Sequence, residues 1–171
     1  MIIRITAKLG KKIGEAPSVV LPLDENPYAD WSAHLFYVFR TQYILITNTL
    51  LLYSMVVFGK GIISDSRFLD HLTHSLSDFI RSDGFESIYE KFIIPAWERV
   101  FFSKTLNRSV TGSMNDLTNL AKFHLVKYSI SPYDLSFKLN ETPMKSLGYI
   151  SPKEAFKAVG GQLGIDTLRF V

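Results

Sequence analysis

The chain has 171 residues, of which 47% are hydrophobic and 20% charged, and its formal net charge is +3. This composition excludes a disordered chain, and the length predicts a single globular domain over residues 1–171 with a sizeable core. The absence of cysteine excludes disulfides and thiolate metal sites, and the net charge alone is too small to indicate nucleic-acid binding.

The N-terminal part predicts two short strands and one basic helical turn. Residues 1–6 alternate loosely in hydrophobicity, residues 7–13 suit a short helical turn, and residues 19–21 suit a strand that Pro22 ends. The basic residues of the turn are Lys8, Lys11 and Lys12. Because the apolar run before Arg4 is short, the N-terminus lacks the core of a signal peptide, which predicts a cytoplasmic protein.

Residues 31–59 hold the densest run of aromatic and β-branched side chains and predict three adjacent antiparallel strands. The apolar runs span residues 35–39, 43–46 and 50–58. The uncharged stretch 41–59 is also near the length of a membrane span, but Asn48 would be poorly satisfied inside a bilayer. We therefore predict a meander covered on both faces, with no membrane partner.

After Gly61 the apolar residues recur at a helical period. The predicted helices span residues 64–83, 86–101 with a break at Pro95, 113–130 and 151–160. Ser113 and Asp116 form an S-x-x-D capping box that predicts the start of the third helix. Residues 135–139 alternate as in a half-buried strand. The predicted fold is α+β, with a mainly antiparallel central sheet and three to four helices packed on it.

Three side chains of the first predicted helix have the residue types of a metal site. His71, His74 and Asp78 share one stripe of that helix, and histidine with carboxylate suits zinc or iron. A solvated polar face has the same pattern, and a site needs a further ligand from elsewhere. We therefore predict no metal site and no cofactor.

Polar residues at two places could bind an anion. His34, Arg40 and Asn48 stand near the ends of predicted strands, where they could hold an anion, serve an acid–base step or satisfy the turns. Arg108, in the predicted polar connection 103–111, precedes the predicted helix start, whose free N–H groups near Ser113 could hold an anion. Ordinary capping explains the second pattern equally well. No P-loop, nucleophile elbow or dinucleotide fingerprint is present.

Several segments resemble a family of uncharacterised bacterial proteins catalogued as a domain of unknown function. They are T-A-K-L at 6–9, W-x-x-H at 31–34, Arg40 with T-N at 47–48, L-Y-S at 52–54, N-R-S-V-T-G-S-M-N-D at 107–116 and L-N-E-T-P-M at 139–144. The resemblance implies no activity, but it implies that a ligand site lies among the polar residues of these segments. The candidate ligand-binding residues are Trp31, His34, Arg40, Asn48, Arg108, Ser113, Asn115 and Asn140.

Three functions are compatible with these residues. The first is a non-enzymatic cytoplasmic binding or regulatory protein that recognises a protein or an anionic ligand. The second is a small enzyme in which His34 is the acid or base, and Arg40, Arg108 or Asn115 holds an anion. The third is nucleic-acid binding through the lysines of residues 8–12. A concave polar pocket would favour the enzyme, and a continuous basic face would favour nucleic acid.

Overall fold

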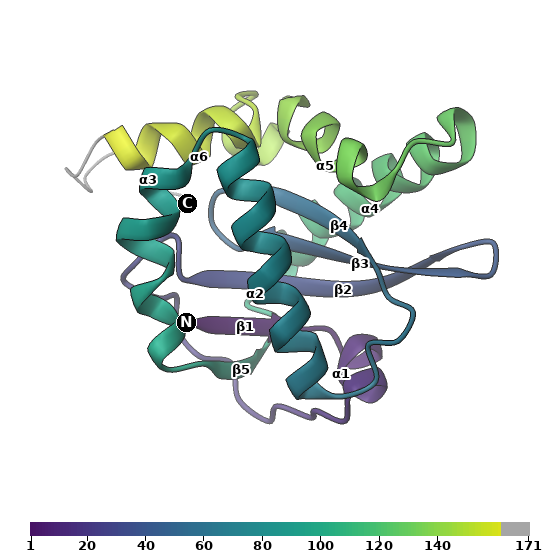
Figure 1. Cartoon of the computed structure of the whole chain (residues 1–171), viewed down its shortest axis with the longest axis horizontal. Coiled ribbons are helices and arrows are strands. Elements are labelled where there is room, and N and C mark those ends of the chain that lie inside the picture. Colours follow the sequence, from purple (N-terminus) through teal and green to yellow (C-terminus); the bar gives the residue numbers. More distant parts are fainter. Residues whose placement is uncertain (162–171) are drawn as a thin grey trace.

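The computed structural model describes residues 1–161, which form a five-stranded sheet with helices on both faces (Figure 1). The strands are β1 (Ile2–Ile5), β2 (Asp30–Val38), β3 (Thr41–Asn48), β4 (Ser54–Phe58) and β5 (Phe101–Lys104), in the order β4-β3-β2-β1-β5. The pairs β2–β3 and β3–β4 are antiparallel, whereas β1 runs parallel to both β2 and β5. The α+β class is confirmed, but the prediction of a mainly antiparallel sheet is wrong, because the sheet is mixed.

Six α-helices lie within residues 1–161, rather than the predicted three or four. They are α1 (Ala7–Ile13), α2 (Asp65–Ser82), α3 (Glu86–Ile88), α4 (Arg108–Tyr128), α5 (Pro132–Glu141) and α6 (Pro152–Gly161). In this described part of the chain, none of the helices has both the length and the apolar character needed to cross a bilayer. The uncharged stretch 41–59 contains β3 and β4 instead.

The sheet separates two apolar cores. Alternate side chains of β2, such as Trp31 and Leu35, enter the first core together with residues of α1, α2 and α6. Phe36 of the same strand enters the second core, where Leu117 of α4 and Leu135 of α5 cover it. Figure 1 looks onto the sheet from the side of α2, which crosses the strands. Both faces of the meander are therefore covered, as its near-continuous apolar runs predict.

Residues 135–139 and 19–21 do not form the predicted strands, and the predicted connection 103–111 begins within a strand. Residues 135–139 belong to α5, because Leu135 and Leu139 are one helical turn apart and both are fully buried. Residues 19–21 form no strand, although the Val19 carbonyl accepts a hydrogen bond of 3.0 Å from the backbone N–H of Lys104. That bond anchors residues 19–21 to β5. The sequence patterns had assigned the residues of β5 to the end of the helix 86–101 and to the connection 103–111.

The helix breaks and caps agree in part with the sequence. Pro95 begins a short 3-10 helix, so the predicted helix 86–101 ends before β5. Ser151 caps α6 as part of a capping box, in which its N–H and hydroxyl both donate to the carboxylate of Glu154 at 2.8 and 2.7 Å. These two bonds hold the pKa of Glu154 below its ordinary value. The predicted start of the helix at 151–160 is therefore confirmed.

Candidate functional site

Trp31 and Asn48 are predicted site residues whose polar groups have structural partners. The Trp31 indole lies fully inside the first core, and its Nε1 donates to the carbonyl of Tyr28 at 2.8 Å. The buried Asn48 side chain donates to the carbonyl of Pro27 at 2.8 Å and accepts from the N–H of Leu51 at 2.8 Å. Asn48 therefore closes the turn between β3 and β4 and ties it to the loop before β2.

Asn140 covers the open edge of the sheet. β4 is an edge strand, and the buried Asn140 side chain of α5 accepts from the Ser54 N–H and donates to the Ser54 carbonyl, both at 2.7 Å. The hydroxyl of Ser136, one turn earlier in α5, accepts from the N–H of Val56 at 2.9 Å. Two side chains of a helix thus supply three hydrogen bonds of the kind that a sixth strand would make.

Replacing Asn140 by alanine is expected to lower the free energy of unfolding by about 2–3 kcal/mol, because two buried backbone groups of Ser54 lose their partners. Urea denaturation followed by circular dichroism measures the loss. The matched control is Asn115→Ala, which removes an exposed asparagine of α4. An equal loss in both variants would contradict the role of Asn140 in covering the edge.

The remaining candidates on α4 do not form the predicted anion site. The helix begins at Arg108, capped by the Asn107 side chain, which accepts from the N–H of Val110 at 2.9 Å. The prediction that this helix begins near Ser113 is therefore wrong. The backbone N–H groups of Ser113 and Asn115 lie inside the helix, where they donate hydrogen bonds to carbonyls one turn earlier. Arg108 and Asn115 are exposed, and so is Arg40 in the turn between β2 and β3.

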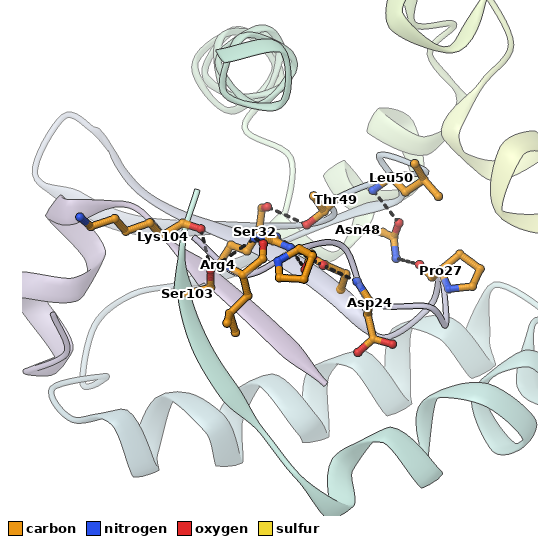
Figure 2. A network of polar contacts seen from close by, with 12 residues as sticks. Arg4, Asp24, Pro27, Ser32, Asn48, Thr49, Leu50, Ser103 and Lys104 are labelled. Carbon is orange, nitrogen blue, oxygen red and sulfur yellow. Dashed lines mark hydrogen bonds and ion pairs between the residues drawn. The ribbon is translucent and has the colours of Figure 1, made fainter. Parts of the chain in front are cut away.

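A row of buried polar side chains crosses the sheet on the face of α4 and α5. One residue of each strand belongs to it, and all five are fully buried; from β5 to β4 they are Ser103, Arg4, Ser32, Thr47 and Ser54. Figure 2 shows Arg4 and Ser32 beside Thr49, whose hydroxyl lies 2.8 Å from that of Ser32. The sequence patterns did not reveal this row, because it depends on the pairing of β1 with β2 and β5.

Arg4 is the one charged residue of the row. Its guanidinium makes two bonds of 2.8 and 2.7 Å to the carboxylate of Asp30, and both side chains are almost fully buried. It also donates to the carbonyls of Leu21 and Pro22, each at 2.8 Å. Because the polar groups of Arg4 and Asp30 are engaged, this network holds the loop before β2 onto the sheet rather than offering free ligands.

A pocket of about 190 Å³ lies beside this network at the start of α4. Thr49, Ser109, Ser113 and Ser146 contribute hydroxyls to its wall, and the Ser113 and Ser146 hydroxyls lie 3.1 Å apart. Small-molecule sites commonly occupy roughly 300–1,000 Å³. The pocket is therefore too small for a ligand of that class.

A larger crevice opens at the carboxyl ends of β1 and β5. These neighbouring strands are parallel, so both ends lie at the same edge of the sheet. The helix after β1 packs into the first core through Leu9, whereas the helix after β5 packs into the second core through Leu117. The segments that follow β1 and β5 therefore leave toward opposite faces of the sheet. This geometry is that of a topological switch point, where open α/β sheets bind their ligands.

The crevice has a volume of about 710 Å³ and mixed walls. Lys11 of α1 and Lys104 of β5 are its two basic lining residues, and Glu15 is its acidic one. The remaining lining is mostly apolar, with three hydroxyls from Thr6, Thr105 and Thr111. Apolar walls with a few cationic and hydroxyl groups suit a small organic anion.

His34 lies next to this crevice without lining it. Its Nδ1 atom lies 3.3 Å from the hydroxyl oxygen of Thr6, which does line the crevice. Burial lowers the pKa of His34 below its ordinary value, and the charges of Lys8 and Lys122 lower it further. The imidazole is therefore neutral at pH 7.

The stripe of His71, His74 and Asp78, considered above as a metal site, holds a solvent-exposed contact between two of its side chains. His74 and Asp78 are both exposed, and His74 Nε2 lies 3.3 Å from a carboxylate oxygen of Asp78. Within residues 1–161, no group of three or more histidine or carboxylate side chains is arranged to hold a metal ion.

The sequence matches one family over most of its length. The family model described as Domain of unknown function (DUF6933) matches residues 2–155, which include all five strands and the crevice. No curated protein matches the chain.

Proposed function

We propose that this chain, which belongs to the DUF6933 family, a domain of unknown function, is a binding protein for a small organic anion. The observation that carries the proposal is the crevice at the carboxyl ends of β1 and β5, where Lys11 and Lys104 line largely apolar walls. An anionic group would lie against the two ammonium groups, and an apolar body would contact the walls.

The surroundings of His34 support binding rather than acid–base catalysis. In the enzyme hypothesis Arg40, Arg108 or Asn115 holds an anion on which His34 acts, but all three are exposed, and none hydrogen-bonds to His34 in the described chain. Its hydrogen-bond partner there is Thr6.

The lysines of α1 support a small ligand rather than nucleic acid. The Lys8 ammonium lies 4.4 Å from the centre of the Tyr37 ring, and Lys12 donates to the side chain of Gln42 at 2.6 Å. Lys11 lines the crevice. Three lysines engaged in three different surroundings do not form the uniform basic face that a nucleic-acid backbone needs.

Replacing Lys11 or Lys104 by methionine is expected to weaken binding of phenyl phosphate or benzoate about tenfold each, because one charge-assisted hydrogen bond is worth roughly 1.5 kcal/mol. The double variant is expected to show no measurable binding. Isothermal titration calorimetry at low ionic strength measures the affinity of each variant.

The matched control is Lys138→Met, which removes the same charge from the exposed surface of α5. It is expected to bind like the wild-type protein. Equal weakening in the control and in the crevice variants would mean that the overall charge of the protein, and not the crevice, determines binding. Failure of both anions to bind the wild type would overturn the proposed function.

A further inference from the structure

Thr6 connects the crevice with His34. It is the residue before α1, in the capping position, yet its side chain makes no capping hydrogen bond. Its hydroxyl oxygen instead lies 3.3 Å from His34 Nδ1, and Thr6 itself lines the crevice. A hydroxyl beside an imidazole can accept a hydrogen bond from the ring and donate its own proton to a second acceptor, such as a ligand bound in the crevice that Thr6 lines.

The charged groups that act on His34 are cations. Lys8 of α1 and Lys122 of α4 both disfavour the imidazolium form, and burial disfavours it more strongly. The residue opposite His34 on β3 is Leu45, which is apolar and fully buried. With no carboxylate among these neighbours, His34 would gain a proton most readily when a negative charge enters the crevice.

We propose that Thr6 and His34 make the crevice selective for a dianion such as a phosphate monoester, and that binding is coupled to the uptake of one proton by His34. This inference rests on the proposed function and names the ligand class and the pH dependence of the same site.

The coupling follows from charge and hydrogen-bond direction. A bound dianion raises the pKa of His34, so the imidazole takes up a proton and its Nδ1–H donates to the hydroxyl oxygen of Thr6. The hydroxyl proton of Thr6 then donates to a phosphate oxygen. The dianion thereby meets a third positive charge beside Lys11 and Lys104, and the three together outweigh the single negative charge of Glu15 in the crevice lining. A carboxylate, with half the charge of the dianion, induces less proton uptake.

The sign of the pH dependence follows from linkage. Because His34 has the higher pKa in the complex, affinity rises as the pH falls through that value and levels off below the pKa of the free protein. Phenyl phosphate is therefore expected to bind about tenfold more tightly at about pH 6.5 than at about pH 8.5. For benzoate we expect a change of about twofold or less.

Calorimetry in two buffers with different ionisation enthalpies tests the inference. At about pH 7.4 a phosphate monoester, whose second pKa is about 6, is almost wholly dianionic. Proton uptake measured there with phenyl phosphate therefore comes from the protein. His34→Gln is expected to abolish the uptake and the pH dependence of binding, Thr6→Val is expected to reduce both, and Thr6→Ser is expected to retain both.

The controls separate failure of this inference from failure of the proposed function. Titration of the ligand itself is identical for the wild type and His34→Gln, so it cancels in their comparison. If the two proteins take up the same number of protons, or benzoate and phenyl phosphate behave alike, the inference is overturned. If neither anion binds, the proposed function fails first. Should His34→Gln not fold, NMR titration of the wild-type imidazole with and without phenyl phosphate decides the same question.

Discussion

Replacing Arg4 by methionine is expected to lower the free energy of unfolding by about 3–5 kcal/mol, because the substitution leaves the Asp30 carboxylate buried without its cation. Both side chains are almost fully buried, and the guanidinium makes two short hydrogen bonds to that carboxylate. The carbonyls of Leu21 and Pro22 lose donors as well. Urea denaturation at neutral pH measures the change.

Two further variants separate the contributions of charge and hydrogen bonding. Arg4→Lys keeps the positive charge but cannot make the bidentate bond, so we expect an intermediate loss of stability. Adding Asp30→Asn to Arg4→Met removes the buried charge and should recover part of the stability. A loss of less than about 1 kcal/mol for Arg4→Met would be in the range of an exposed ion pair. It would show that water reaches the Asp30 carboxylate and that the row of polar side chains is not sealed from solvent.

Replacing Ile46 by aspartate is expected to cost at least about 4 kcal/mol, because it removes a core side chain and places an unpaired carboxyl there. Ile46 is 1% exposed and lies between Ala33 of β2 and Met55 of β4. With a stability of about 5–15 kcal/mol for a typical domain, much of the variant would be unfolded at room temperature. Thermal denaturation followed by circular dichroism measures the shift.

The same strand offers a control for this prediction. Thr41 is exposed at the other end of β3, and Thr41→Asp is expected to change stability by no more than about 0.5 kcal/mol. The buried carboxyl would have a raised pKa in the folded state, so the deficit of Ile46→Asp should shrink as the pH is lowered. Similar melting temperatures for the two variants would contradict a central position for β3.

Local patterns were sufficient to predict the meander, α1 and the start of α6. In each case the signal comes from residues close together in the sequence, such as the apolar runs 35–39 and 43–46 of the meander or the helical segment that begins at Ser151. Membership of a family with a domain of unknown function was likewise anticipated from short segments. The matched region 2–155 contains all of those segments.

β5 and the crevice could not be predicted in this way. The four residues from Phe101 to Lys104 form a strand because they pair with β1, almost one hundred positions earlier in the chain. A parallel pairing of this kind leaves no alternating signature in so short a segment. Since the crevice lies where β1 and β5 end together, the roles proposed for Thr6, Lys11 and Lys104 could not be inferred without that pair.

The start of α4 was predicted wrongly because two residues near it are suited to cap the helix. Asn107 and Ser113 are both good capping residues, and the S-x-x-D pattern favours the second. In the structure Asn107 accepts the capping bond, and Ser113 lies buried one and a half turns into the helix, at the wall of the small pocket. Only the packing of the whole helix against the sheet distinguishes the two.

The cover that Asn140 provides for Ser54 has a consequence for biosynthesis. At a translation rate of about 5–20 residues per second, the 86 positions that separate the two residues leave the outer edge of β4 bare for roughly 4–17 s. For the first part of that interval, until Lys104 has been made, the sheet also lacks β5. A nascent chain on one ribosome could then pair through β4 with a chain on the next. Fragments that end before α5 should therefore be the forms of this protein most prone to co-aggregation.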